Sequence, residues 1–78
     1  MDIKVLGTGC AKCKRLEDVT QDAVDQLGID ATVEKVEDIM KIMEYGIMRT
    51  PGLVIDGKVV LSGEVPKLEI IKDLLTNN

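Results

Sequence analysis

The stretch Gly7-Thr8-Gly9-Cys10-Ala11-Lys12-Cys13 stands between a short alternating run and a long amphipathic segment. Residues 2–7, which end at a glycine, are typical of a β-strand, and the next two residues predict a turn. From Ala11 to Leu27 the apolar side chains recur at the i, i+3, i+4, i+7 spacing of an amphipathic helix, and Gly28 supplies a stop. The first cysteine is therefore expected just before a helix and the second in its first turn.

The spacing of Cys10 and Cys13 argues for chemistry and against a structural staple. A bridge across three positions closes a very small loop, so it constrains the unfolded chain far less than a long loop does. At the start of a helix, unpaired N–H groups and the positive end of the helix dipole favour the thiolate of Cys10. The thiolate is the form that attacks disulfides, and Lys12 adds positive charge that is expected to stabilise it.

The two cysteines are expected to divide one exchange reaction between them. Cys10 is the exposed nucleophile that attacks a substrate disulfide and forms a mixed disulfide. Cys13, one helical turn later, points inward and resolves that intermediate. The products are an oxidised Cys10–Cys13 pair and a reduced substrate.

The rest of the chain predicts three further strands and two further helices. Residues 29–34 alternate apolar and polar side chains, which indicates a half-buried strand. Asp38 can cap a short helix that Gly46 closes. Residues 53–61 spell a β-hairpin with a two-residue turn, and Pro66 suits the first turn of a last helix.

The resulting order, β-α-β-α-β-β-α, predicts an α/β fold in a single domain spanning residues 1–78. Because a helix joins the first two strands, they should lie parallel with a right-handed crossover, while the hairpin adds an antiparallel pair. One mixed four-stranded sheet with helices on both faces is the simplest way to bury the apolar stripes.

The composition of the chain argues against two classes of partner, nucleic acids and membranes. The 78 residues have one aromatic side chain and a net charge of −4, which argues against nucleic acid because its phosphates favour a basic partner. No apolar run approaches the ~20 residues that span a bilayer, and no signal segment precedes the first strand, so we expect a cytoplasmic protein that does not bind a membrane. Aliphatic side chains and methionine must fill the core, and Met40, Met43 and Met48 are interpreted as core residues.

Three ordered markers resemble the thioredoxin superfamily over essentially the whole chain. They are the Gly7–Cys13 stretch after the first strand, Thr50-Pro51-Gly52 before the hairpin, and Ser62-Gly63 near the last helix. The nearest group is that of very small prokaryotic thioredoxin-like proteins, also called redox-active disulfide proteins. This resemblance implies a minimal thioredoxin fold, with Cys10 as nucleophile, Cys13 as resolving thiol and Pro51 as a cis-proline. The backbone of Thr50 and the neighbouring Gly63 are then expected to bind substrate.

The resemblance also implies a reaction and its partners. The protein would be a protein-disulfide oxidoreductase that carries electrons between a thioredoxin-reductase-like flavoprotein and disulfide-containing proteins. It would work through the Cys10–Cys13 disulfide with no other cofactor and no metal, and we expect a monomer. Gly9 precedes the motif where thioredoxins usually have an aromatic residue, and Ala11-Lys12 replaces their Gly-Pro. Their buried acid near the resolving cysteine has no counterpart between Ile3 and Gly7.

A heavy-metal-binding or chaperone domain is the alternative function. Such domains also place a CxxC between a first strand and a first helix, and two thiolates suit Cu(I) or Zn(II). They follow a β-α-β-β-α-β order, however, and usually have methionine two residues before the first cysteine, where this chain has Thr8. These differences favour the redox interpretation. A third possibility is a binding module that keeps the fold and makes little use of its cysteines.

Overall fold

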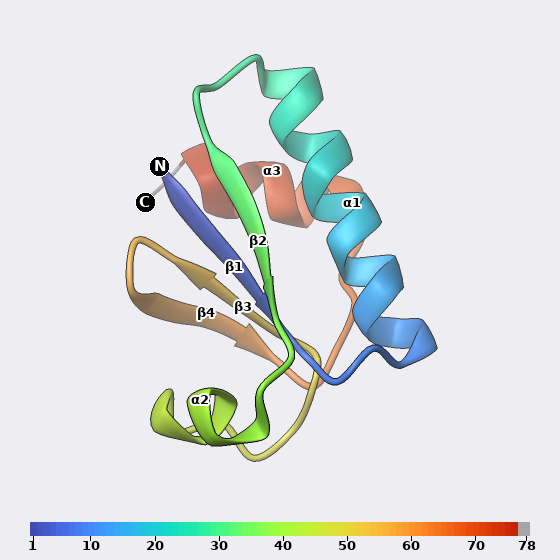
Figure 1. Cartoon of the computed structure of the whole chain (residues 1–78). Helices are drawn as coiled ribbons and strands as arrows, with labels where there is room; N and C mark the ends of the chain where they lie inside the picture. Colours follow the sequence, from blue (N-terminus) through green and yellow to red (C-terminus); the bar gives the residue numbers. More distant parts are fainter. Residues whose placement is uncertain (77–78) are drawn as a thin grey trace.

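The strands and helices follow the expected order (Figure 1). The computed structural model describes residues 1–76, and residues 77–78 of the expected domain lie outside the described part. The elements are β1 (Asp2–Leu6), α1 (Ala11–Leu27), β2 (Thr32–Val36), α2 (Ile39–Glu44), β3 (Gly52–Ile55), β4 (Lys58–Ser62) and α3 (Leu68–Thr76).

The four strands form one mixed sheet in the order β2-β1-β3-β4. β1 pairs in parallel with β2, Asp2 lying opposite Thr32, and pairs antiparallel with β3 on its other side. β3 and β4 form the hairpin, with a register shift between Leu53 and Val54. The α/β class and the mixed four-stranded sheet are thus confirmed. The end of β1, the start of β3 and the end of β4 consequently meet at one end of the sheet.

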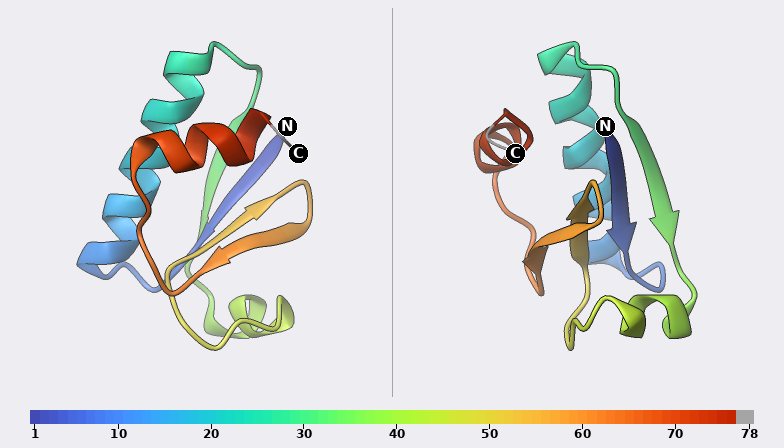
Figure 2. Two further views of the ribbon diagram at one scale, coloured as in Figure 1. Left: turned by 180° about the vertical axis from the view of Figure 1, so that it is seen from behind. Right: turned by 90° about the vertical axis from the view of Figure 1, so that its left-hand side faces the viewer.

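Helices cover both faces of this sheet (Figure 2). Alternation along β1 sends Ile3 and Val5 to the face that α1 and α3 cover, and sends Leu6 to the face that carries α2. Burial of this apolar surface stabilises the fold by roughly 25 cal/mol per Å². The larger buried cluster consists of Ile3, Val5, Leu16, Ala23, Val24, Leu53, Ile55, Ile71 and Leu75.

The largest differences from the expected boundaries are at the starts of two elements. The second strand begins at Thr32, about three residues later than the alternating pattern indicated, because β1 supplies pairing partners only from Asp2 onward. Ile29, one of the earlier residues, nevertheless packs against the larger cluster. The last helix begins at Leu68, since the N–H groups of residues 70 and 71 donate to the carbonyl of Lys67, and Pro66 therefore precedes the helix.

The interpretation of the three methionines as core residues was wrong. Met40, Met43 and Met48 are 70%, 65% and 98% exposed. α2 has only six residues, and among them only Ile42 is buried, in the small cluster with Leu6 and Val54. A helix this short covers only part of the sheet face, so the side chains on its flanks remain in solvent.

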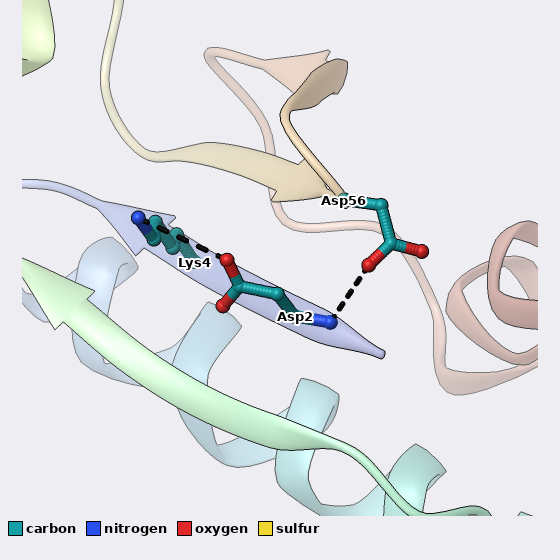
Figure 3. A network of polar contacts seen from close by, with 3 residues as sticks. All are labelled: Asp2, Lys4 and Asp56. Carbon is teal, nitrogen blue, oxygen red and sulfur yellow. Dashed lines mark hydrogen bonds and ion pairs between the residues drawn. The ribbon is translucent and has the colours of Figure 1, made fainter.

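The hairpin turn is fastened to the beginning of β1 (Figure 3). Asp56 and Gly57 both have positive φ, 49° and 83°, as a two-residue turn of this kind requires. The Asp56 carboxylate accepts a hydrogen bond from the backbone N–H of Asp2 at 2.8 Å, and the Asp56 N–H donates to the Asp2 carbonyl at 2.7 Å. Asp2 also forms an ion pair with Lys4 at 3.9 Å. The turn therefore joins the third and fourth strands to the first.

Candidate active site

Cys10 is the residue that caps α1. Its backbone is extended, with φ −69° and ψ 166°, and its carbonyl accepts the N–H of Lys14 at 3.0 Å. Its Sγ accepts the backbone N–H of Cys13 at 3.2 Å. The sulfur thus occupies the position where a capping oxygen usually accepts a free N–H, at the positive end of the helix dipole. Negative charge on this exposed sulfur is favoured by both effects.

Cys10 and Cys13 are joined by a disulfide, with their Cα atoms 5.1 Å apart. Their surroundings are unequal, because Cys10 is exposed whereas Cys13 is only 5% exposed. An incoming molecule can reach the sulfur of Cys10 far more easily than that of Cys13. Lys12 lies exposed between the two cysteines in the first turn of α1.

Gly7 packs directly against the inner cysteine. A Cβ built on Gly7 would overlap the Sγ of Cys13 and would lie 2.8 Å from its Cβ. The Gly7 N–H donates to the carbonyl of Val36 at 2.9 Å, which fixes the residue to the end of β2. The contact of Gly7 with Cys13 was not predicted from the sequence, where Gly7 was interpreted as the end of a strand and as part of the Gly7–Cys13 stretch. The presence of glycine three residues before Cys10 was the one sequence feature that could have indicated it.

The Thr50–Pro51 segment lies at the same end of the sheet. The peptide bond between these residues is cis, Pro51 is buried and Thr50 is exposed. The Pro51 carbonyl accepts the N–H of Gly63 at 2.7 Å, so Gly63 lies beside this segment with its own N–H already used. Gly63 has a φ of 81°, and a Cβ there would lie 3.0 Å from the side chain of Arg49. The structure thus brings together Thr50, Pro51 and Gly63.

An apolar groove connects this segment with the turn before Cys10. It has a volume of about 240 Å³, and Thr8 and Thr50 both line it. Its apolar lining includes Ile39, Met43 and Met48, which the sequence analysis did not include in the site. Two of the three exposed methionines, Met43 and Met48, therefore line the same groove as Thr8 in the turn before Cys10.

A second cavity, of about 170 Å³, opens at Cys13. Two charged residues that line it, Glu17 from α1 and Lys35 from β2, form an ion pair at 3.9 Å. Sequence reasoning missed both. Glu17 could have been found from its position one turn after Cys13, whereas only the pairing of β1 with β2 places Lys35 at this cavity.

The structure offers little support for the alternative function in metal binding. Among residues 1–76 no group of three or more His, Cys, Asp or Glu residues could hold a metal ion. The helix α2 between β2 and β3 also departs from the β-α-β-β-α-β order of those domains.

None of the helices within residues 1–76 has the length and apolar character needed to span a membrane.

Comparisons with known proteins agree with this geometry. The family described as "Thioredoxin domain" matches residues 1–76. A protein named thioredoxin from Methanothermobacter thermautotrophicus is 43% identical over 76 residues, which cover 97% of this chain and 99% of that protein. A protein of the same name from Methanocaldococcus jannaschii is 41% identical over 73 residues, covering 94% of this chain and 84% of that protein. The chain therefore belongs to the thioredoxin family of thiol–disulfide oxidoreductases, which work through a redox-active disulfide without a further cofactor.

Proposed function

We propose that Cys10 is the attacking sulfur and Cys13 the resolving sulfur of this oxidoreductase. One observation carries the assignment: the exposed Sγ of Cys10 accepts an N–H at the start of α1, while Cys13 is 5% exposed. The N–H bond at the helix start favours the thiolate of Cys10, and burial keeps Cys13 from reacting with other molecules. Exposed Lys12 adds positive charge in the same helical turn and favours the Cys10 thiolate.

The cycle balances as a two-electron exchange. The Cys10 thiolate attacks one sulfur of a substrate disulfide, forms a mixed disulfide and releases the other substrate sulfur as a thiolate, which takes up a proton. Cys13, after losing its proton, attacks the Sγ of Cys10 and releases the second substrate thiol. The Cys10–Cys13 pair is now oxidised and the substrate disulfide is reduced. A reductase then returns two electrons and two protons to the pair.

The substrate is an extended segment of a disulfide-containing protein, lying across the apolar groove. Thr50 is exposed at one edge of this groove and Thr8, two residues before Cys10, lines it as well. The backbone of Thr50 can pair with such a segment in the manner of strand addition. Gly63 donates its N–H to Pro51 and thereby supports the buried proline that follows Thr50.

The proposed cellular setting and partners suit the chemistry of the Cys10–Cys13 pair. The reductase that the family implies would be a flavoprotein like thioredoxin reductase, and the protein would work as a monomer in the cytoplasm. The short spacing of the disulfide supports this proposal. A bridge across three positions serves thiol exchange better than stability, and such exchange-active pairs are the ones found in reducing compartments.

The test is a comparison of Cys10→Ser with Cys13→Ser. In reduced protein, the remaining Cys10 should be alkylated with a pH profile centred below that of a free cysteine, whereas the remaining Cys13 should require higher pH. Cys13→Ser should also accumulate a mixed disulfide with a disulfide protein, and Cys10→Ser should not. Identical alkylation profiles together with equal trapping would show that the roles are assigned wrongly. Added Zn(II) that blocked alkylation of the wild type at one equivalent would support the metal-binding alternative.

A further inference from the structure

The proposed resolving step leaves one proton without a destination. A thiol attacks a disulfide only as the thiolate, so Cys13 must lose its proton before it can release the substrate. Bulk water has little access to this sulfur, because Cys13 is 5% exposed and Gly7 packs against it. A group near Cys13 must therefore receive the proton.

The cavity at Cys13 has one carboxylate among its lining residues. Val5 of β1 and Gly7, which follows this strand, cannot accept a proton, and α1 and β2 contribute Lys14 and Lys35, which are cations. Glu17 supplies the remaining polar side chain. It lies four residues after Cys13 on α1, a spacing that places two side chains on the same face of a helix.

Lys35 lies close enough to pair with this carboxylate. Its Nζ lies 3.9 Å from Oε2 of Glu17, and β2 carries it to the cavity from the neighbouring strand. The Glu17 side chain is 27% exposed, so it is half-buried at the cavity while remaining in contact with solvent. A cavity of about 170 Å³ exceeds the space that one water molecule needs, so a water molecule can relay a proton between the thiol and the carboxylate.

We propose that Glu17, positioned by Lys35, accepts the proton of Cys13 during resolution of the mixed disulfide. The proposal rests on the assignment of Cys10 and Cys13 given above. The S–H bond of Cys13 breaks, its proton moves to the Glu17 carboxylate directly or through one water molecule, and the thiolate attacks Cys10. The substrate leaves as a thiolate, and Glu17 then gives its proton to solvent. When the reductase restores the dithiol, Glu17 takes up a proton from solvent and passes it to the Cys13 thiolate.

The sequence offers a matched control for this carboxylate. Glu37 also lies near the redox-active turn, where its Oε2 would be 3.4 Å from a Cβ on Gly9, yet it does not line the cavity at Cys13. Glu37→Gln therefore removes the same charge from the same region without touching the proposed proton route. Lys14, the other cation at the cavity, stays unchanged in both variants.

The experiment follows the resolving step alone, by rapid mixing of the reduced protein with a chromogenic aromatic disulfide across a pH series. Glu17→Gln should slow resolution at neutral pH by on the order of 100-fold, the lower end of the range for loss of acid–base catalysis, and this deficit should shrink as pH rises. Glu37→Gln should remain within about twofold of the wild type. Lys35→Met should show a smaller deficit with the same pH trend. The first step, measured in Cys13→Ser, should be unaffected by Glu17→Gln.

The sign of the change separates proton transfer from a purely electrostatic effect. Removing a negative charge beside Cys13 favours its thiolate, so a carboxylate that acted only through its charge would speed resolution when changed to Gln. If Glu17→Gln resolves the mixed disulfide as fast as Glu37→Gln, or faster, at every pH, the proposal is overturned. Failure of wild-type Cys10 to form any mixed disulfide would instead refute the proposed function. Should Glu17→Gln fail to fold, Glu17→Ala provides the same test, and full-speed resolution at neutral pH in that variant, which has no carboxylate, would count against the proposal.

Discussion

At the scale of single residues, the site depends on how closely Gly7 approaches Cys13. Gly7 follows the last residue of β1, and its N–H donates to the carbonyl of Val36, so its backbone cannot move away from Cys13 without loss of that hydrogen bond. A methyl group there would overlap the Cys13 sulfur. The space beside the resolving sulfur is therefore limited by a residue that carries none of the reacting atoms.

Gly7→Ala should consequently affect both stability and exchange. Overpacking at a buried contact typically costs about 1–3 kcal/mol, and the new methyl group should displace Cys13 from its line of attack on Cys10. We expect a lower free energy of unfolding in urea and slower resolution of the mixed disulfide. In a Cys13→Ala background the stability cost of the same substitution should be smaller, because the sulfur is gone. An equal cost in both backgrounds would mean that the contact with the sulfur is unimportant.

Some of these residues could be predicted from the sequence and others could not. The positions of Cys10 and Cys13 at the start of α1 depend on local signals, namely a strand that ends at glycine and a helical apolar stripe. Lys35 could not be predicted as a neighbour of Cys13, because only the parallel register of β2 with β1 brings it there. The exposure of Met43 was also missed, since periodicity shows that a helix has an apolar side without showing how much surface covers that side.

At the scale of elements, α2 presents an apolar flank next to the redox-active turn. Exposed methionines suit a surface that receives different partners, because their side chains are flexible and polarisable. Met43 and Met48 line the groove that ends at Thr8 and Thr50. A short helix that leaves its flank uncovered is thus compatible with the proposed substrate groove and takes no side chain from the main core.

Met43→Gln should therefore weaken exchange with protein disulfides selectively. With insulin as substrate we expect KM to rise roughly three- to tenfold, as for one contact worth about 1 kcal/mol, while kcat stays near that of the wild type. Turnover of a small disulfide such as cystamine should be unchanged, because it does not extend along the groove. Ile70→Gln on α3, where Ile70 is 51% exposed, is the matched control. Equal effects of the two variants on insulin reduction would remove the groove from substrate binding.

At the scale of the whole molecule, the sheet assembles the site from segments that are distant in sequence. The turn after β1, Thr50 before β3 and Gly63 after β4 all lie at one end of the sheet because β1 runs antiparallel to β3. The fold class followed from the order of the elements, since a helix-linked strand pair and a tight hairpin leave few arrangements. The strand boundaries could be predicted less well from the sequence, because the position of the partner strand determines where pairing starts.

The opposite end of the sheet holds the hairpin against β1, and Asp56 makes the connection (Figure 3). Asp56→Ala removes the carboxylate that accepts the Asp2 N–H, and it places alanine at a φ of 49°, where a Cβ is unfavourable. These losses together should cost on the order of 1–2 kcal/mol, which lowers the melting temperature by roughly 5–10 °C in a domain of this size.

Asp56→Asn is the informative control, because asparagine tolerates positive φ and keeps an oxygen that can accept the same N–H. Its melting temperature should lie close to that of the wild type, and both variants should exchange disulfides at wild-type rates at 25 °C, since the turn lies at the end of the sheet remote from Cys10. A loss of stability in Asp56→Asn as large as that in Asp56→Ala would assign the effect to charge, and the ion pair between Asp2 and Lys4 would then be the next interaction to remove. Calorimetry on the three proteins decides between these outcomes. An unchanged melting temperature in Asp56→Ala would instead show that backbone pairing between β1 and β3 alone holds the hairpin in place.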